Sequence, residues 1–157
     1  MLTEYNEDGS VGLLLNKPMN IKINELVFDF PMFESKVFLG GPVQTDSIHF
    51  LYYDGDLISD SLEIKDGIFW NGSFEELKEN ISEKKINKDD IRFYLGYSGW
   101  SANQLENEIK NGTWHVIDYD LKKIFKKDFN NLWKEIMEEL GDKHSVFANF
   151  PDDPYLN

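Results

Sequence analysis

Apolar residues along this chain follow two different periods, and each period predicts one kind of secondary structure. Several short runs are rich in β-branched and aromatic residues and end at Gly, Pro or Asp, which is typical of partly buried strands. Two of these runs are joined through Lys65-Asp66-Gly67, which predicts a hairpin. The predicted strands are Val11–Asn16, Lys36–Leu39, Ser47–Tyr53, Ser61–Ile64, Gly67–Trp70, Ile91–Tyr97 and Trp114–Asp118.

Other segments repeat their apolar residues every three or four positions, as a helix with one buried face does. Two have a serine three residues before a Glu or Gln, a spacing that caps a helix N-terminus: Ser73 with Glu76, and Ser101 with Gln104. The predicted helices are Glu25–Phe30 after an Asn24 cap, Phe74–Lys84, Ala102–Lys110 and Phe129–Leu140 between an Asp128 cap and a Gly141 stop, with a short helical turn at Leu121–Phe125.

One stretch, residues 93–112, combines a strand, a glycine turn and a capped helix. The strand ends where Ser98-Gly99 predicts a turn, and Gly112 is placed to stop the helix in a left-handed conformation. Trp100 follows the turn, and we expect its large ring to fill part of the core.

The motifs of this stretch, with three others, resemble one known family. They are Gly96-Tyr97-Ser98-Gly99-Trp100, Gln104-Leu105-Glu106-x-Glu108-Ile109, Gly112-x-Trp114, Gly12–Pro18, Gly40-Gly-Pro-Val43 and Asp153–Asn157. Their order and spacing over nearly the whole chain are similar to those of the YqgE/AlgH proteins. The resemblance implies an α+β fold: a single domain with a branched, mixed or antiparallel β-sheet that includes a small barrel, flanked by about four helices. It also implies a role often described as transcriptional regulation, without a settled biochemical activity.

The chain departs from the family pattern at three places. Asn103 stands where the family usually has a glycine, and Tyr52 where it usually has a histidine. The family's N-terminal segment, which includes a β-strand, has no counterpart before Leu2. We therefore expect residues 11–16 to lose a neighbouring strand and to favour homodimerisation, unless another segment covers that edge.

The length of the chain and its content of 41% hydrophobic residues are typical of a single domain, and we predict one domain spanning residues 1–157. Cysteine is absent, which excludes disulfides, thiol catalysis and thiolate metal sites. The first residues are polar and acidic, and no apolar run reaches the length that spans a bilayer. The prediction is a cytoplasmic protein with no membrane partner.

Charge argues against direct nucleic-acid binding. The formal net charge is −13, and Arg92 is the only arginine. Proteins that bind nucleic acids obtain most of their affinity from clustered Lys and Arg at the phosphates. The lysines at 122, 123, 126 and 127 are surrounded by aspartates, which favours a solvated helix face.

No recognisable catalytic, metal or cofactor signature is present. Gly96–Trp100 resembles the G-x-S-x-G nucleophile elbow, but Trp100 occupies the second glycine position. The three histidines, His49, His115 and His144, have no partner at metal-ligand spacing. We therefore predict no catalytic residues, no metal and no cofactor.

Two functions from different classes remain. The first, which we prefer, is a non-enzymatic interaction or indirect regulatory protein that acts through its acidic surface or through a shallow groove beside the Gly-Trp turn. The alternative is a small-ligand-binding protein or an enzyme, with a pocket beside the turn at residues 96–108. The partner would be an unidentified protein or small molecule. The candidate binding residues are Asn16, Lys17, Tyr97, Trp100 and Glu106.

Overall fold

Strand β8 (Ile91–Ser101) organises the structure, because three other strands pair with it. In this computed structural model, which describes residues 1–53, 57–126, 131–139 and 141, β8 is antiparallel to β2 and β5 and parallel to β4. The sheet order is β1-β2-β8-β5-β7-β6, and β4 with β3 forms a side branch. The other strands are β1 (Leu2–Asn6), β2 (Gly9–Gly12), β3 (Pro18–Lys22), β4 (Lys36–Leu39), β5 (Val43–Tyr53), β6 (Leu62–Lys65) and β7 (Ile68–Trp70).

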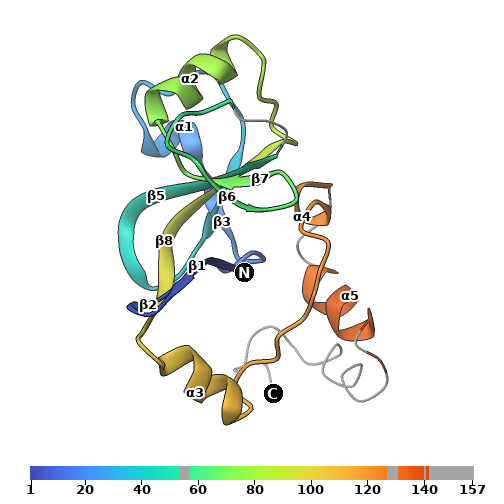
Figure 1. Cartoon of the computed structure of the whole chain (residues 1–157). Helices are drawn as coiled ribbons and strands as arrows, with labels where there is room; N and C mark the ends of the chain where they lie inside the picture. The colour runs from blue at the N-terminus through green and yellow to red at the C-terminus, as the bar shows by residue number, and fades with distance from the viewer. Residues whose placement is uncertain (54–56, 127–130, 140, 142–157) are drawn as a thin grey trace.

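The branched sheet curls into a nearly closed barrel, and helices lie around it (Figure 1). The predicted α+β fold is therefore confirmed. In the described parts of the chain the helices number five, where about four were predicted. They are α1 (Ile23–Leu26), α2 (Phe74–Ser82), α3 (Gln104–Lys110), α4 (Lys123–Lys126) and α5 (Leu132–Glu139).

Two strand predictions near α3 were wrong. The turn expected at Ser98-Gly99 is absent, because β2 pairs with β8 from Ser98 to Ser101 and keeps the backbone extended. Residues 114–118 form no strand, since no described strand pairs with them. A short apolar run becomes a strand only where a partner accepts its backbone hydrogen bonds.

The first residues differ most from expectation. The polar stretch before Asp8 forms β1, which pairs with β2 and supplies the neighbour that residues 11–16 were expected to lack. Met1 extends this pairing: its amino group donates to the Leu13 carbonyl (2.9 Å), and the Leu13 amide donates back (2.8 Å). β2 ends at Gly12, earlier than predicted. β3 begins at Pro18, which an edge strand tolerates in its first position.

The first helix also lies earlier than predicted. Glu25 accepts from the Lys22 backbone amide (3.0 Å), so α1 begins at Ile23. Asn24 closes the following loop instead of capping the helix: its side-chain oxygen accepts from the Phe33 amide (3.2 Å). Polar side chains of this kind bond to whichever backbone group the tertiary structure brings close.

The later helices agree better with the sequence. The Ser73 hydroxyl accepts from the Glu76 amide (3.4 Å), as predicted, but the Glu76 carboxylate binds Ser59 instead of completing a capping box. α2 ends at Ser82 rather than Lys84. α4 overlaps the predicted turn at residues 121–125. α5 lies within the predicted helix 129–140, whose first two residues, last residue and Asp128 cap fall outside the described residues.

The central sheet carries one core on each face. Beneath α1 and α2 lies an aromatic core that contains Phe30, Phe33, Phe50 and Phe93. The opposite face packs against α4 through a second cluster, which contains Phe38, Leu51, Tyr94, Ile124 and Phe125. Figure 1 places α1 and α2 at one end of the molecule and α3 at the other. None of the described helices is long and apolar enough to cross a bilayer.

Glycines allow two backbone segments to cross beside β8. Gly96 has φ +65°, and a Cβ there would lie 2.7 Å from the carbonyl oxygens of Gly41 and Val43. A Cβ on Gly40 would lie 2.1 Å from the Gly96 oxygen. Contacts this short leave no room for any side chain. The crossing of these two segments therefore explains why the Gly40–Val43 motif begins with two glycines.

Candidate functional site

An open groove of about 470 Å³ runs along the end of the sheet where β1, β2 and β8 meet. We call it the β1–β2 groove. Its polar residues come mainly from the β1–β2 hairpin, and its aromatic residues come from β8. It is lined by Glu4, Asn6, Asp8, Gly9, Ser10, Val11, Val43, Tyr97, Gly99 and Trp100.

Tyr97 is held in place on one side of the groove. Its ring meets the His49 ring edge-on, with centroids 5.7 Å apart, and His49 stacks on Trp70 at 5.9 Å. Gly99 supplies the room: a Cβ there would lie 3.3 Å from Tyr97 Cε2. The ring is therefore confined before any ligand is present.

The hydrogen-bond partners of His49 fit a neutral ring with its proton on Nε2. The Asn71 oxygen accepts from the Phe50 amide (3.0 Å), so the Asn71 nitrogen faces His49 Nδ1 (3.1 Å) and donates to it. His49 Nε2 then donates to the Ser47 hydroxyl (3.1 Å). Burial lowers the pKa of His49 below its usual value, which agrees with the neutral form. This histidine positions Tyr97.

Two carboxylates, Glu4 and Asp8, belong to the lining of the groove. Glu4 accepts from the Asn6 side-chain nitrogen (2.6 Å), while the Asn6 oxygen accepts from the backbone amides of Asp8 (2.9 Å) and Gly9 (3.2 Å). Asn6 thus ties Glu4 to the hairpin turn. Glu4, Asn6 and Asp8 are all exposed, and the described residues that line the groove include no Lys or Arg.

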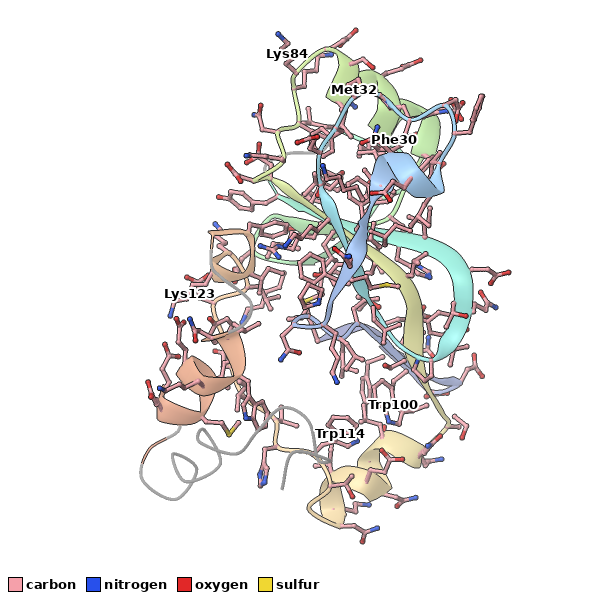
Figure 2. The ribbon with its side chains drawn as sticks, turned by 180° about the vertical axis from the view of Figure 1, so that it is seen from behind. Phe30, Met32, Lys84, Trp100, Trp114 and Lys123 are labelled. Atoms are coloured by element: carbon pink, nitrogen blue, oxygen red, sulfur yellow. The ribbon has the colours of Figure 1, made fainter. Side chains whose placement is uncertain are left out.

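Trp100 belongs to a second arrangement, which we call the Glu108 clasp: Trp100, Gln104, Glu108 and Trp114. One Glu108 oxygen accepts from the indole N–H groups of Trp100 (3.0 Å) and Trp114 (2.6 Å), and the other accepts from Gln104 (2.8 Å). The two indoles lie edge to face at 5.8 Å, close together beside α3 (Figure 2). Donation from Trp114, then from Gln104, lowers the pKa of Glu108.

The clasp corrects two predictions. Trp100 was expected in the core, but it is only partly buried and outside both core clusters, because Glu108 binds its polar edge near the surface. Gln104 does accept from the Ser101 amide (3.0 Å) as a capping box requires, but the Ser101 hydroxyl donates to the same oxygen. The N-cap residue is Asn103, in a left-handed conformation that asparagine tolerates.

Of the five predicted site residues, only Tyr97 and Trp100 line the β1–β2 groove. Asn16 and Lys17 lie in the loop between β2 and β3, where the Lys17 carbonyl accepts from the Leu39 amide (2.8 Å). Glu106 is on α3, and a hydrogen bond from the Tyr5 hydroxyl lowers its pKa. The structure therefore does not place the five residues around this groove.

Sequence reasoning missed the groove's carboxylates. Glu4 and Asp8 lie in a stretch read only as polar, and nothing in its pattern indicates that it folds beside Tyr97. The Asp8-Gly9 turn signal was the one available clue, since such dipeptides often join two strands.

Two other kinds of polar group in the described residues bear on the search for a site: metal-type clusters and the single arginine. Within the described ranges, no three His, Asp or Glu residues are grouped as a metal would need. Arg92 is buried against the Phe38 ring, 5.2 Å from its centroid, and burial lowers the pKa of Arg92 to about 10. Its guanidinium is therefore a core group. His144 falls outside the described residues.

Comparisons with known proteins identify the family. The model of the AlgH-like family matches residues 1–145. A UPF0301 protein of Chlorobium limicola is 40% identical over 157 residues, with 100% of this chain and 84% of the relative covered. One from Cytophaga hutchinsonii is 39% identical over 158 residues, with 100% and 87% covered. This chain belongs to the AlgH-like family.

Solved structures agree with this assignment. The solution structure of the AlgH protein from Pseudomonas aeruginosa matches with a TM-score of 0.74 at 26% identity, over 97% of this chain and 83% of that one. The crystal structure of protein DIP2367 from Corynebacterium diphtheriae also gives a TM-score of 0.74, at 16% identity over 96% of this chain and 81% of that one. That second likeness shows the fold alone.

Proposed function

We propose that this chain is a non-enzymatic interaction or indirect regulatory protein, and that it binds its partner at the β1–β2 groove. The observation that carries the proposal is that the groove is formed in advance. His49 and Gly99 confine Tyr97, and Asn6 holds the hairpin turn beside Glu4. A surface ordered before binding loses less conformational entropy when a partner arrives.

The openness of the groove favours a macromolecular partner. A site for a small molecule usually buries most of its ligand's surface. Here the hairpin side chains Glu4, Asn6 and Asp8 are exposed, so a small molecule would keep much of its surface in water. A partner that covers both the hairpin and Tyr97 would bury more area and exclude that water.

Site-specific photocrosslinking in cells that express this protein tests the proposal. A benzophenone side chain replaces Tyr97 in one variant and Met32 in another. Met32 is 92% exposed and lies at the opposite end of the molecule from Trp100 (Figure 2). We expect a discrete protein adduct from position 97 and none of the same mass from position 32. Identical adducts from both positions, or none from position 97, would refute it.

A further inference from the structure

We infer that the partner binds at the β1–β2 groove as a protein segment extended along the outer edge of β1, and that this segment carries a lysine or arginine whose cation lies at the carboxylates of Glu4 and Asp8. This inference rests on the proposed function and names the chemistry of the partner. It follows from the division of the groove into an acidic part and an apolar part.

The acidic part is the β1–β2 hairpin, and the apolar part is the wall formed by β2, β5 and β8. Among the lining residues, Glu4 and Asp8 supply negative charge, while Val11, Val43 and Tyr97 supply apolar surface. Lysine and arginine have the matching construction, since an apolar stem carries a charged end. Neither an acidic nor a purely apolar side chain would match both parts.

Charge excludes the other macromolecular occupants. Phosphates of a nucleic acid would meet Glu4 and Asp8, and no Lys or Arg stands among the described lining residues to neutralise them. A second copy of this chain would bring the same carboxylates face to face, and each copy has a net charge of −13. β1 itself, Leu-Thr-Glu-Tyr-Asn, has no basic residue to offer a copy. A basic segment of another protein is the occupant that attraction favours.

The edge of the sheet favours an extended segment over a small free amine. Among the described strands, β1 pairs only with β2, so its other edge has no strand beside it. Edge strands accept extended chains through backbone hydrogen bonds. A segment added there places its side chains beside Glu4, at the distance of a cross-strand pair.

Nuclear magnetic resonance titration of the full chain tests the inference with three probes. The first is a capped dodecapeptide of alternating threonine and lysine, the second has glutamate in place of lysine, and the third is spermidine. We expect the lysine peptide to shift amide signals of β1, Tyr97 and Gly99. We expect the glutamate peptide to leave them unchanged and spermidine to shift them much less. Binding of the lysine peptide should weaken as ionic strength rises to about 0.15 M.

A matched pair of double variants tests the location of the charge. Glu4→Gln with Asp8→Asn should weaken binding of the lysine peptide about tenfold, because two ion pairs are lost. Glu79→Gln with Asp60→Asn removes the same charge from exposed residues outside the groove, and should weaken it less than about threefold. Unchanged amide dispersion in both variants shows that they fold.

The outcomes separate this inference from the proposed function. Equal weakening by the two double variants, shifts spread over the whole acidic surface, or spermidine binding as well as the lysine peptide would each overturn the inference. The proposed function would survive any of these if position 97 still forms its discrete adduct. If position 97 forms no adduct, the proposed function fails whatever the peptide does.

Discussion

The aromatic core beneath α1 and α2 and the Glu108 clasp beside α3 both depend on aromatic rings, but different forces hold them. In the core, Phe93 is fully buried and meets Phe30 and Phe33 nearly perpendicularly, at centroid distances of 5.6 and 6.2 Å. In the clasp, Trp100 and Trp114 are held near the surface by one carboxylate. Burial stabilises the first region, and hydrogen bonds define the second.

This difference indicates where the molecule can change without unfolding. Removing apolar burial from the core lowers the free energy of unfolding of the whole domain. Removing the carboxylate from the clasp frees two indoles near the surface and leaves both cores intact. The β1–β2 groove shares Trp100 with the clasp, so the proposed binding surface lies at the end that tolerates change.

The largest effect is expected from Phe93→Ala, which removes a ring with no exposed surface. The free energy of unfolding should fall by about 3–5 kcal/mol, through lost burial and an unfilled cavity. Urea denaturation measures it. The control Phe93→Leu keeps most of the volume and should cost less than about 1.5 kcal/mol. Equal losses for the two variants would show that ring packing does not dominate this core.

The next largest loss of the free energy of unfolding is expected from Gly96→Ala, which tests the backbone crossing between the two regions. A left-handed alanine costs roughly 1–2 kcal/mol, and here its Cβ would also lie 2.7 Å from two carbonyl oxygens. Gly112→Ala is the matched control, because it has φ +75° with no atom within 4 Å of the added Cβ. Chemical denaturation should show that Gly96→Ala lowers the free energy of unfolding more than Gly112→Ala does. Equal losses would show that the short contacts at the crossing add no cost.

Trp100→Ala should lower the free energy of unfolding less than Phe93→Ala does, although tryptophan has the larger side chain. The ring is only partly buried, so we expect a loss of about 1–2 kcal/mol. Trp100→Phe keeps a ring and removes only the indole donor, so it should cost less still. The melting temperatures of the three variants give the order. A loss for Trp100→Ala as large as for Phe93→Ala would restore the expectation of a core tryptophan.

The smallest effect is expected from acid on the clasp. The folded-state pKa of Glu108 is lowered, so its contribution is fully present above the unfolded pKa, about 4.3, and is lost as pH falls through the folded value. The indole N–H signals of Trp100 and Trp114 should therefore shift only below about pH 4.3. The Trp70 signal should stay constant, since its indole nitrogen is buried and has no hydrogen-bond partner among the described residues. Glu108→Gln should abolish this pH-dependent shift of the indole signals. If the shift persists in the Glu108→Gln variant, another group causes it.

The sequence predicted the elements whose signals are local. β4 was predicted at its observed bounds, and the β6–β7 hairpin and α2 were each located to within two residues. Gly112 is left-handed as predicted, and its amide donates to the Ile109 carbonyl (3.0 Å). Such signals work because the alternation of side chains, the cap and the glycine act over only a few residues.

The candidate site was predicted only in part, for the opposite reason. Tyr97 and Trp100 were chosen for their motif, and both line the groove. Glu4 and Asp8 reach it only because β1 and β2 fold back onto β8, about ninety residues away along the chain. No periodicity within residues 1–8 reports that pairing.

By itself, the sequence determined which segments have a buried face, where several helices begin and stop, and that the chain is acidic with a single arginine. Only the tertiary structure decided that β8 continues through Gly99, that Trp100 binds Glu108 instead of the core, and that residues 114–118 form no strand. The physical reason is the same in all three. A backbone or polar group takes the partner that folding brings within hydrogen-bonding distance, and that partner comes from elsewhere in the chain.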